Sequence, residues 1–271
     1  MRKQPSIAIF SVATNIYFDY WKNMVISADK YLFNQNAKHF HVFTDRQVDV
    51  NFEKGLSNKS KIHVHKISNL QWPLATLNRY KLISEIGPKI DNQVFMHLDA
   101  DMIVVPNQDQ DLGRFLKKKH ISLIRHPGYW RVQFPNRFKF YINFPKFFVK
   151  DIILLLKFGG LGTWSRDGKS RAFVQRKNRS KYFCGAVWFG EKAEILKFVK
   201  ELSTITDIDL DRGSIPAWND ESYLNYWATK NSFVELEPKF CYAEDYANLI
   251  YLNPTIIAIN KTKKKELRIN E

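Results

Sequence analysis

Two pairs of neighbouring carboxylates have the residue types and the spacing best suited to chemistry. Asp99 and Asp101 lie in "HLDADM", directly after an apolar run. If that run is a β-strand, its two-residue period points both side chains the same way. Two carboxylates that converge beyond a strand form a hard-oxygen site, which suits Mg²⁺ or Mn²⁺ with coordination positions left open for a diphosphate. The competing interpretation is a strand end that finishes in acidic turn residues.

Asp220 and Glu221 form the second pair, inside "WNDESYLN" at 218–225. Asn219 is a good helix N-cap, and acids in the first turn favour the positive end of the helix dipole. Capping a helix therefore accounts for all three residues when the stretch is taken alone.

The elements that must position these acids alternate along the chain. Predicted strands cover 7–12, 39–44, 61–67, 93–99 and 184–190, and predicted helices lie near 17–33, 76–86, 191–203 and 219–229. This alternation is typical of an α/β fold, in which helices cover a sheet and ligands bind beyond the carboxyl ends of its strands. One domain is expected to span 1–271. The glycines of "GTWSRDGKS" at 162–170 are separated by five residues where a phosphate loop requires four, so an ordinary loop is expected there.

The charge balance is strongly basic, with 42 Lys and Arg against 27 Asp and Glu. Such an excess favours polyanions, phosphorylated small molecules or an anionic membrane face. Because the basic tracts are spread along the chain and form no single stripe, nucleic acid is not an expected partner. Two cysteines are too few for a disulfide framework, and no uncharged apolar run approaches the ~20 residues of a membrane span. A soluble protein of a reducing, cytoplasmic compartment is expected.

The segment at 131–160 interrupts the alternation, because aromatic and basic residues interleave there before the short apolar run "IILLL". One interpretation is an extra helix and loop that cover the core. The other is a surface that rests on anionic lipid, with apolar side chains in the interface and Lys and Arg at the head groups.

Four stretches, taken in chain order, resemble one family: "HLDADM", "HPGYW" at 126–130, "KYFCGAVWFGEKAEIL" at 181–196 and "WNDESYLN". Together they resemble glycosyltransferase family six, the family of the ABO blood-group transferases and the α-1,3-galactosyltransferases, in a bacterial-type soluble form. The resemblance covers most of the chain, and 131–160 looks like an insertion. Asn219 and Tyr223 stand where the family has histidines. Asp99 and Asp101 are kept, although many bacterial relatives carry asparagines there, which favours metal dependence.

The resemblance implies a GT-A fold, a Rossmann-like mixed sheet flanked by helices in one domain. It implies transfer of galactose or N-acetylgalactosamine from a UDP-sugar to a glycan or glycolipid hydroxyl, with retention of configuration, in an α linkage of the α-1,3 type. Such an enzyme would serve surface polysaccharide or lipopolysaccharide synthesis. Asp99 and Asp101 would hold Mn²⁺ (or Mg²⁺) at the diphosphate. Glu221 would act as nucleophile or as an anion that stabilises the oxocarbenium-like transition state.

Further site residues are implied by the same resemblance. Tyr17 would border the uracil, Arg79 would lie near the donor, and Asp220 would bind hydroxyls of the transferred sugar. In a tail at 261–271, which would cover the donor, Lys263 and Arg268 would reach the diphosphate. Cys184 and Ala186 occupy the positions that discriminate the C2 substituent of the donor, where Ala186 leans toward galactose. His126 and Trp218 would meet the acceptor.

Each of these residues also has a plain structural interpretation. Arg79 would form a salt bridge on a helix face, Trp218 would anchor the start of a helix, and His126 would be a structural loop residue. A lysine-rich end is more often solvated and frayed.

Two other functions compete with this one. The first is another metal-dependent retaining GT-A transferase that uses a different UDP-sugar. The second is a basic protein that binds nucleic acid or other anions without turnover; its weakness is the ordered set of acidic motifs. For the transferase, a place at the inner face of the cytoplasmic membrane is expected.

Overall fold

The computed structural model describes residues 4–131, 136–244 and 253–261. A seven-stranded sheet forms its centre, in the order β3-β2-β1-β4-β7-β6-β8. The strands are β1 (Ile7–Val12), β2 (Lys38–Thr44), β3 (Ser60–Lys66), β4 (Val94–Leu98), β6 (Ile121–Arg125), β7 (Phe183–Glu191) and β8 (Val234–Leu236). Strands β1 to β4 are mutually parallel, whereas β7 runs antiparallel to both β4 and β6. The predicted α/β fold with a mixed sheet is confirmed, and it is consistent with a single GT-A-like domain.

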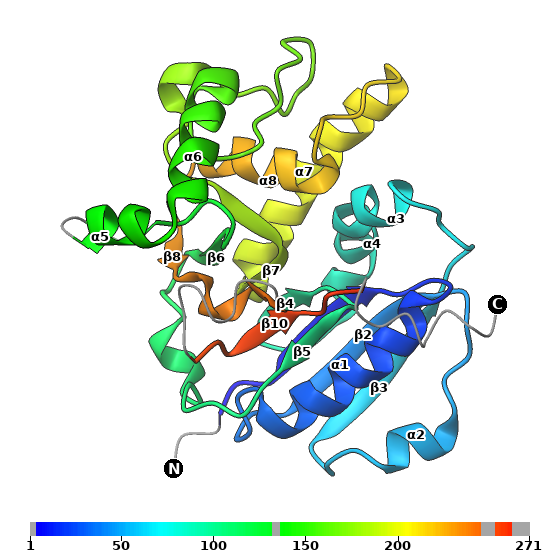
Figure 1. Cartoon of the computed structure of the whole chain (residues 1–271). Helices are drawn as coiled ribbons and strands as arrows, with labels where there is room; N and C mark the ends of the chain where they lie inside the picture. Colours follow the sequence, from blue (N-terminus) through cyan, green and yellow to red (C-terminus); the bar gives the residue numbers. More distant parts are fainter. Residues whose placement is uncertain (1–3, 132–135, 245–252, 262–271) are drawn as a thin grey trace.

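Helices pack on both faces of this sheet (Figure 1). Ile7 and Ile9 of β1 belong to the core beneath α1 (Tyr17–Tyr31). Ala8 and Phe10 belong to the second core, together with α4 (Arg79–Ile86), α7 (Lys192–Asp211) and α8 (Asn219–Ala228). Because both faces of β1 are buried, the strand is apolar almost throughout and does not alternate with polar residues.

A second, three-stranded sheet has the order β5-β10-β9 and consists of β5 (Met102–Val104), β9 (Tyr242–Ala243) and β10 (Ile256–Ala258). Strand β10 pairs antiparallel with β5, so that Ala258 lies opposite Met102. The ladder brings the end of the described chain beside the acids that follow β4. Sequence analysis did not predict this sheet.

Most predicted elements lie within a few residues of their observed bounds, with two exceptions. The helix expected near 76–86 is two helices, α3 (Leu74–Leu77) and α4, which meet at Asn78. The helix expected at 191–203 continues to Asp211 as α7. The remaining short elements are α2 (Val50–Lys54) and the 3-10 helices η1 (Gly87–Lys89), η2 (Leu112–Arg114), η3 (Arg176–Asn178) and η4 (Pro238–Phe240). No regular element falls within 162–170, as expected for an ordinary loop.

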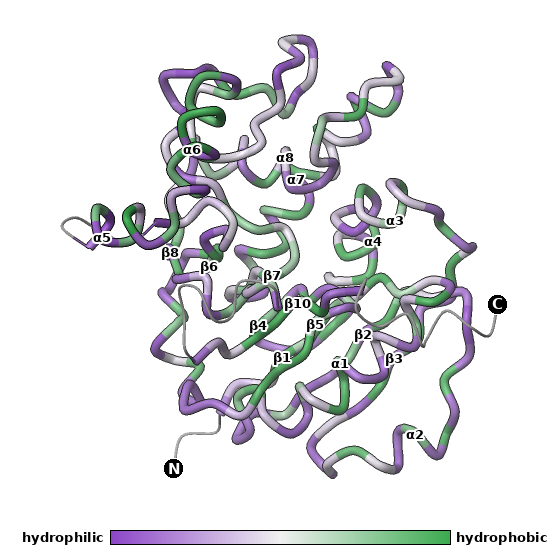
Figure 2. Tube along the Cα trace, in the orientation of Figure 1, coloured by the Kyte–Doolittle hydropathy of each residue, from purple (hydrophilic) through white to green (hydrophobic). Residues whose placement is uncertain are grey.

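The segment at 136–158 forms α5 (Asn136–Asn143) and α6 (Pro145–Phe158), which project away from the central sheet (Figure 1). The expected extra helix is therefore present. It covers little of the core, because α6 buries only Asp151 and Leu154. Arg131 anchors α6 through two hydrogen bonds to the Asp151 carboxylate, at 2.7 and 2.6 Å. In Figure 2 the outer turns of α6 are strongly hydrophobic.

Candidate active site

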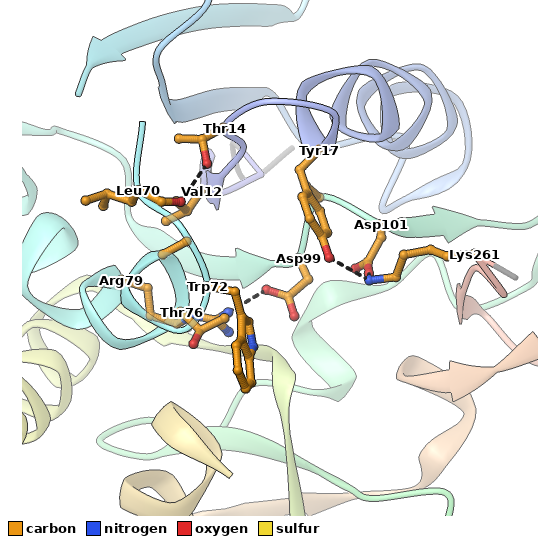
Figure 3. Close-up of a pocket in the computed structure, with 12 residues that line it drawn as sticks. Val12, Thr14, Tyr17, Leu70, Trp72, Thr76, Arg79, Asp99, Asp101 and Lys261 are labelled. Carbon is orange, nitrogen blue, oxygen red and sulfur yellow. Dashed lines mark hydrogen bonds and ion pairs between the residues drawn. The ribbon is translucent and has the colours of Figure 1, made fainter. Parts of the chain in front are cut away.

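A cavity of about 220 Å³ opens beyond the carboxyl ends of β1 and β4 (Figure 3). This is the edge of the sheet where the sequence predicted a ligand. The cavity is lined by Val12, Thr14, Tyr17, Leu70, Trp72, Ala75, Thr76, Arg79, Asp99, Ala100, Asp101 and Lys261.

Arg79 joins the two acidic motifs. Its guanidinium lies 3.1 Å from a carboxylate oxygen of Asp99 and 3.1 Å from one of Asp220, and it donates to the carbonyl oxygen of Gly185 at 3.2 Å. Only 5% of its side chain is exposed. Burial would lower the pKa of Arg79, but Asp220 and Asp99 outweigh burial and raise it, so the guanidinium stays charged. The salt bridge expected on a helix face therefore exists, but it is buried beside the cavity.

Asp99 is held in its ionised form. Its Oδ1 contacts Arg79 and lies 3.0 Å from Nε2 of His97. Burial opposes ionisation, but Arg79 and then His97 outweigh burial and lower the pKa of Asp99 to about 2. The Asp99 N–H donates to the carbonyl oxygen of Ala186 at 3.0 Å, which fixes the turn after β4 against β7.

Asp101 faces the same cavity from the turn before β5 (Figure 3). Its Oδ2 lies 2.6 Å from Nζ of Lys261. Burial and the charge of Asp99 raise the pKa of Asp101 against the opposing effect of Lys261. A second cation near the pair would favour ionisation of both acids. Two carboxylates with no sulfur or imidazole facing the cavity form a donor set that fits Mg²⁺ or Mn²⁺.

Lys261 is a site residue that sequence analysis missed. It donates to the hydroxyl oxygen of Tyr17 at 3.0 Å and lies 4.7 Å from the centre of the Tyr17 ring. The β5–β10 ladder positions it, since the Ile259 N–H donates to the carbonyl oxygen of Asp101 just beyond that ladder. Lys263 and Arg268, the residues chosen from the same basic tract, lie outside the described residues. Tyr17 itself lines the cavity.

Glu221 lies on α8 next to β7. Its Oε2 accepts a hydrogen bond from the Gly185 N–H at 2.9 Å. Burial raises the pKa of Glu221 to about 8, although the Gly185 N–H favours the ionised form. A side chain at position 185 would be crowded, because a Cβ there would lie 2.9 Å from a carboxylate oxygen of Asp220. The "CGA" stretch therefore needs glycine for α8 to approach the strand.

Asn225, the last residue of "WNDESYLN", joins two elements through its side-chain amide. Its side chain accepts from the Phe183 N–H at 2.8 Å and donates to the Phe183 carbonyl oxygen at 2.9 Å. It also donates to the carbonyl oxygen of Glu221 at 2.9 Å. This buried amide joins α8 to β7 one turn away from Glu221.

The expectation that Asn219 caps the helix is wrong. Asn219 is the first residue of α8 and has a φ of +41°, while Trp218 holds the cap position without a side-chain cap bond. A left-handed residue here turns the chain sharply, which directs the next side chain, Asp220, toward Arg79. Trp218 is 52% exposed and lies outside the cavity lining, whereas Tyr223 is fully buried and donates to Asp209 at 3.1 Å.

The two residues expected at the donor C2 position flank Gly185 on β7. Ala186 is half-buried and bonds Asp99 through its carbonyl oxygen. Cys184 is buried in the core, with its sulfur 2.7 Å from that of Cys241. These positions place the pair beside Glu221 and not in the lining of the cavity.

His126 has structural contacts within its own loop. Its Nδ1 accepts from the Gly128 N–H at 3.0 Å, and its ring packs against that of Tyr129 with centres 4.6 Å apart. Burial, and then Lys150, lowers the pKa of His126 to about 4, so the ring is neutral at physiological pH. The ring also packs edge-on to that of Tyr182, whose pKa is raised by burial and then by the nearby charge of Glu221.

Sequence analysis did not predict two other residues that line the cavity, because no motif marks them. Trp72 lines the cavity with 75% of its surface exposed, and Thr76 follows it in α3. A sequence alone does not show that a tryptophan is exposed or that it borders a cavity.

Two known proteins are similar to this chain. The O-antigen biosynthesis glycosyltransferase WbnI of Escherichia coli is 24% identical over 241 residues, which are 89% of each protein. The human globoside alpha-1,3-N-acetylgalactosaminyltransferase 1 is 22% identical over 224 residues, which are 81% of this chain and 56% of the human protein. No protein-family model matches the chain. Both relatives are glycosyltransferases, and their similarity over most of the chain supports a glycosyltransferase, with a sugar donor and a glycan acceptor.

Within the described ranges, no helix is long and apolar enough to cross a membrane.

Proposed function

We propose that this protein is a retaining transferase of the family-six type, which moves galactose or N-acetylgalactosamine from a UDP-sugar to a glycan hydroxyl in an α-1,3 linkage. The observation that carries the proposal is the buried Arg79, which joins Asp99 after β4 to Asp220 beside Glu221. One side of such a site would hold the diphosphate and the other would hold the sugar.

The donor would occupy the cavity in Figure 3. Tyr17 and Trp72 offer flat aromatic surfaces for the uracil, and the charged Lys261 lies beside Asp101 where the diphosphate would sit. Asp99 and Asp101 would hold Mn²⁺ or Mg²⁺, which when bound would neutralise charge on the departing diphosphate. Opposite unit charges ~4 Å apart attract by about 4 kcal/mol at an effective dielectric constant near 20, so each cation near the leaving group matters to the rate.

Asp220 and Glu221 would act on the transferred sugar. Arg79 holds the Asp220 side chain in one position, which suits an acceptor of sugar hydroxyl hydrogen bonds. Glu221 would serve as nucleophile or as a stabilising anion on the face of the sugar opposite the leaving group. Retaining glycosidases need a second carboxyl group to protonate a poor leaving group. A diphosphate leaves without that proton, so one carboxylate suffices here.

Donor choice would depend on the strand residues beside Glu221. Ala186 would narrow the space beside the C2 carbon and favour galactose, whereas Cys184 is buried against Cys241 and would affect that space little. An Ala186→Gly change would therefore favour N-acetylgalactosamine.

The acceptor is a glycan or glycolipid presented at an anionic membrane. The α5–α6 surface carries eight exposed large apolar side chains, each between 42% and 73% exposed: Phe138, Ile142, Phe148, Val149, Ile152, Ile153, Leu155 and Leu156. Five basic residues lie among them, namely Arg137, Lys139, Lys146, Lys150 and Lys157. The single carboxylate of these two helices, Asp151, is buried against Arg131. An apolar surface with basic neighbours fits the inner face of the cytoplasmic membrane.

The decisive experiment is product analysis. The protein is incubated with UDP-Gal, UDP-GalNAc or UDP-Glc, Mn²⁺ and a panel of galactosides, and the new anomeric centre is assigned by NMR. The proposal requires transfer from UDP-Gal or UDP-GalNAc with an α linkage. Turnover of a different UDP-sugar alone would favour another retaining transferase. Salt-sensitive oligonucleotide binding without UDP-sugar affinity would favour a non-catalytic anion-binding protein.

Membrane contact is tested by co-sedimentation with vesicles of phosphatidylcholine, with and without phosphatidylglycerol. Binding should require the anionic lipid and should fall at least tenfold in Leu156→Asp. The matched control is Ile26→Asp, since Ile26 is also an exposed aliphatic residue on a helix, 52% exposed on α1 against 73% for Leu156. Equal binding by both variants would rule out the α5–α6 surface.

A further inference from the structure

Four histidines gather on one face of the sheet. His39 and His41 alternate along β2, and His63 and His65 alternate along the neighbouring strand β3. Because strand side chains alternate between faces, all four point to the same face. The parallel register places His41 opposite His63.

This cluster lies apart from the candidate active site. The histidines line a second cavity of about 530 Å³, whose other lining residues include Ser6 before β1 and Asn92 before β4. Those residues mark the amino ends of the strands, whereas the candidate active site opens at the carboxyl ends. The two cavities share no lining residue. A site here would therefore be independent of the proposed transfer reaction.

The ring nitrogens approach one another closely. Nδ1 of His41 lies 3.0 Å from Nε2 of His65, and Nδ1 of His39 lies 3.4 Å from Nε2 of His63. One nitrogen each of His39, His41 and His63 lies within 4.8 Å of the other two. The rings are stacked, with 11° between the planes of His41 and His63 and 29° between those of His39 and His63, so they must rotate out of the stack before three lone pairs converge on one ion.

His41 supplies a second and independent observation. It is 4% exposed, and its Nε2 is buried with no hydrogen-bond partner among the described residues. A buried polar atom that lacks a partner destabilises the fold, so such atoms are rare in native proteins. A metal ion bound by this ring would remove part of that cost, either directly at Nε2 or by turning the ring so that Nε2 reaches a partner.

The protonation state suits metal binding. Burial lowers the pKa of all four rings, and the pKa of His41 falls to about 3 because its three neighbours add to the effect. Neutral imidazoles have a free lone pair at physiological pH, so no proton has to be displaced before a metal binds.

We propose that His39, His41 and His63 bind a late first-row transition-metal cation, Zn²⁺ in the first instance, with His65 or water as the fourth ligand. An all-imidazole donor set selects Zn²⁺, Cu²⁺ or Ni²⁺ over Mg²⁺, Mn²⁺ and Ca²⁺, which prefer oxygen. Tetrahedral Zn²⁺ with Zn–N bonds of about 2.0–2.1 Å separates its ligand nitrogens by roughly 3.4 Å. The His39–His63 pair already has that separation. The ion would link β2 to the edge strand β3.

The test uses tag-free, full-length protein that has been freed of metal by a chelator and dialysed. Zn²⁺ is titrated by calorimetry, and Co²⁺ is followed by its visible ligand-field absorption. One Zn²⁺ per chain should bind, should displace Co²⁺, and should raise the melting temperature. His63→Gln and, separately, His39→Gln should each weaken Zn²⁺ binding at least tenfold and remove the Co²⁺ absorption. His120→Gln is the matched control, because His120 is a partly exposed histidine at the start of β6, outside the cavity.

Two results would overturn the proposal. Unchanged Zn²⁺ affinity in both cluster variants would show that the histidines do not bind the ion. Loss of Zn²⁺ in an Asp99→Asn, Asp101→Asn double variant, with retention in His63→Gln, would assign the ion to the carboxylates of the active site. Circular dichroism of each variant verifies folding, and the half-buried positions of His39 and His63 make glutamine a mild change.

Discussion

The carboxylate of Glu221 accepts a hydrogen bond from the backbone N–H of Gly185 at 2.9 Å. This bond fixes an acid of α8 against β7, at a position two residues after Phe183, whose backbone N–H and carbonyl both bond Asn225. Glu221 is therefore held between two packed elements, which suits its proposed role beside a reacting carbon.

Replacement of Glu221 by glutamine should remove the ionisable carboxyl group and keep the shape of the side chain. The amide oxygen can still accept from Gly185, so UDP affinity should stay within about twofold, while kcat for transfer should fall by about 100-fold or more. Calorimetry with UDP and initial rates of transfer check the two parts. A variant with a near-normal kcat would remove Glu221 from the reaction.

The same variant should change how stability depends on pH. Burial raises the pKa of Glu221 to about 8 in the folded protein, against about 4.3 when unfolded. Because the pKa is higher in the folded protein, the stability that Glu221 contributes is fully present below its unfolded pKa. It is lost as pH rises through its folded pKa. Urea unfolding at pH 5 and pH 9 gives the free energy of unfolding of both proteins. Between these pH values, that of Glu221→Gln should rise relative to that of the wild type by on the order of 2 kcal/mol. Each pKa unit is worth about 1.4 kcal/mol, and partial exposure reduces the total. If the free energies of unfolding of the two proteins changed in parallel with pH, the raised pKa of Glu221 would be contradicted.

Arg79→Met should destabilise the protein by about 3 kcal/mol at neutral pH, because Asp99 and Asp220 would lose their shared cation. The matched control is Arg114→Met, whose partner Asp111 is 64% exposed, like Arg114 itself at 74%. That change should cost no more than about 0.5 kcal/mol. Equal losses in urea unfolding would show that Arg79 contributes only packing.

Asn225→Ala should cost about 2 kcal/mol, since it leaves the buried backbone groups of Phe183 without partners. It should also lower transfer activity, because the turn of α8 that carries Glu221 would loosen. Asn231→Ala, which removes a single bond from an exposed side chain to Trp227, should change both properties little. The measurements are urea unfolding and initial rates.

Metal removal should stop transfer. A chelator should abolish activity and added Mn²⁺ should restore it, while Asp101→Asn should require at least tenfold more Mn²⁺ for half-maximal rate. Asp109→Asn is the control, because Asp109 pairs with Lys239 at 2.9 Å, much as Asp101 pairs with Lys261, but lies outside the active-site cavity. Full activity in excess chelator would exclude the cation.

Local sequence pattern predicted the elements that carry the acids. The apolar run before Asp99 and the periodicity after Trp218 correspond to β4 and α8, whose bounds are Val94–Leu98 and Asn219–Ala228. Both elements follow from the local periodicity of apolar residues, which can be read from the sequence.

Three features of the structure depend on contacts between segments that are distant in the sequence, so local patterns could not predict them. Lys261 reaches Asp101 only because β10 pairs with β5, and no local pattern records that pairing. Asn219 has a left-handed conformation beside the Asp220–Arg79 ion pair and does not cap the helix, which its capping preference did not predict. The alternating histidines at 39–41 and 63–65 are visible in the sequence, but their meeting depends on the adjacency of β2 and β3.

The antiparallel pairing of β10 with β5 also orders events during synthesis. Residues Met102–Val104 leave the ribosome long before Ile256–Ala258, so β5 has no partner strand until β10 has been made. Until then Asp101 lacks its ammonium neighbour, and the nascent chain has a half-built pocket that should bind nucleotide poorly. The proposed donor pocket is therefore complete only after β10 has been synthesised and has paired with β5.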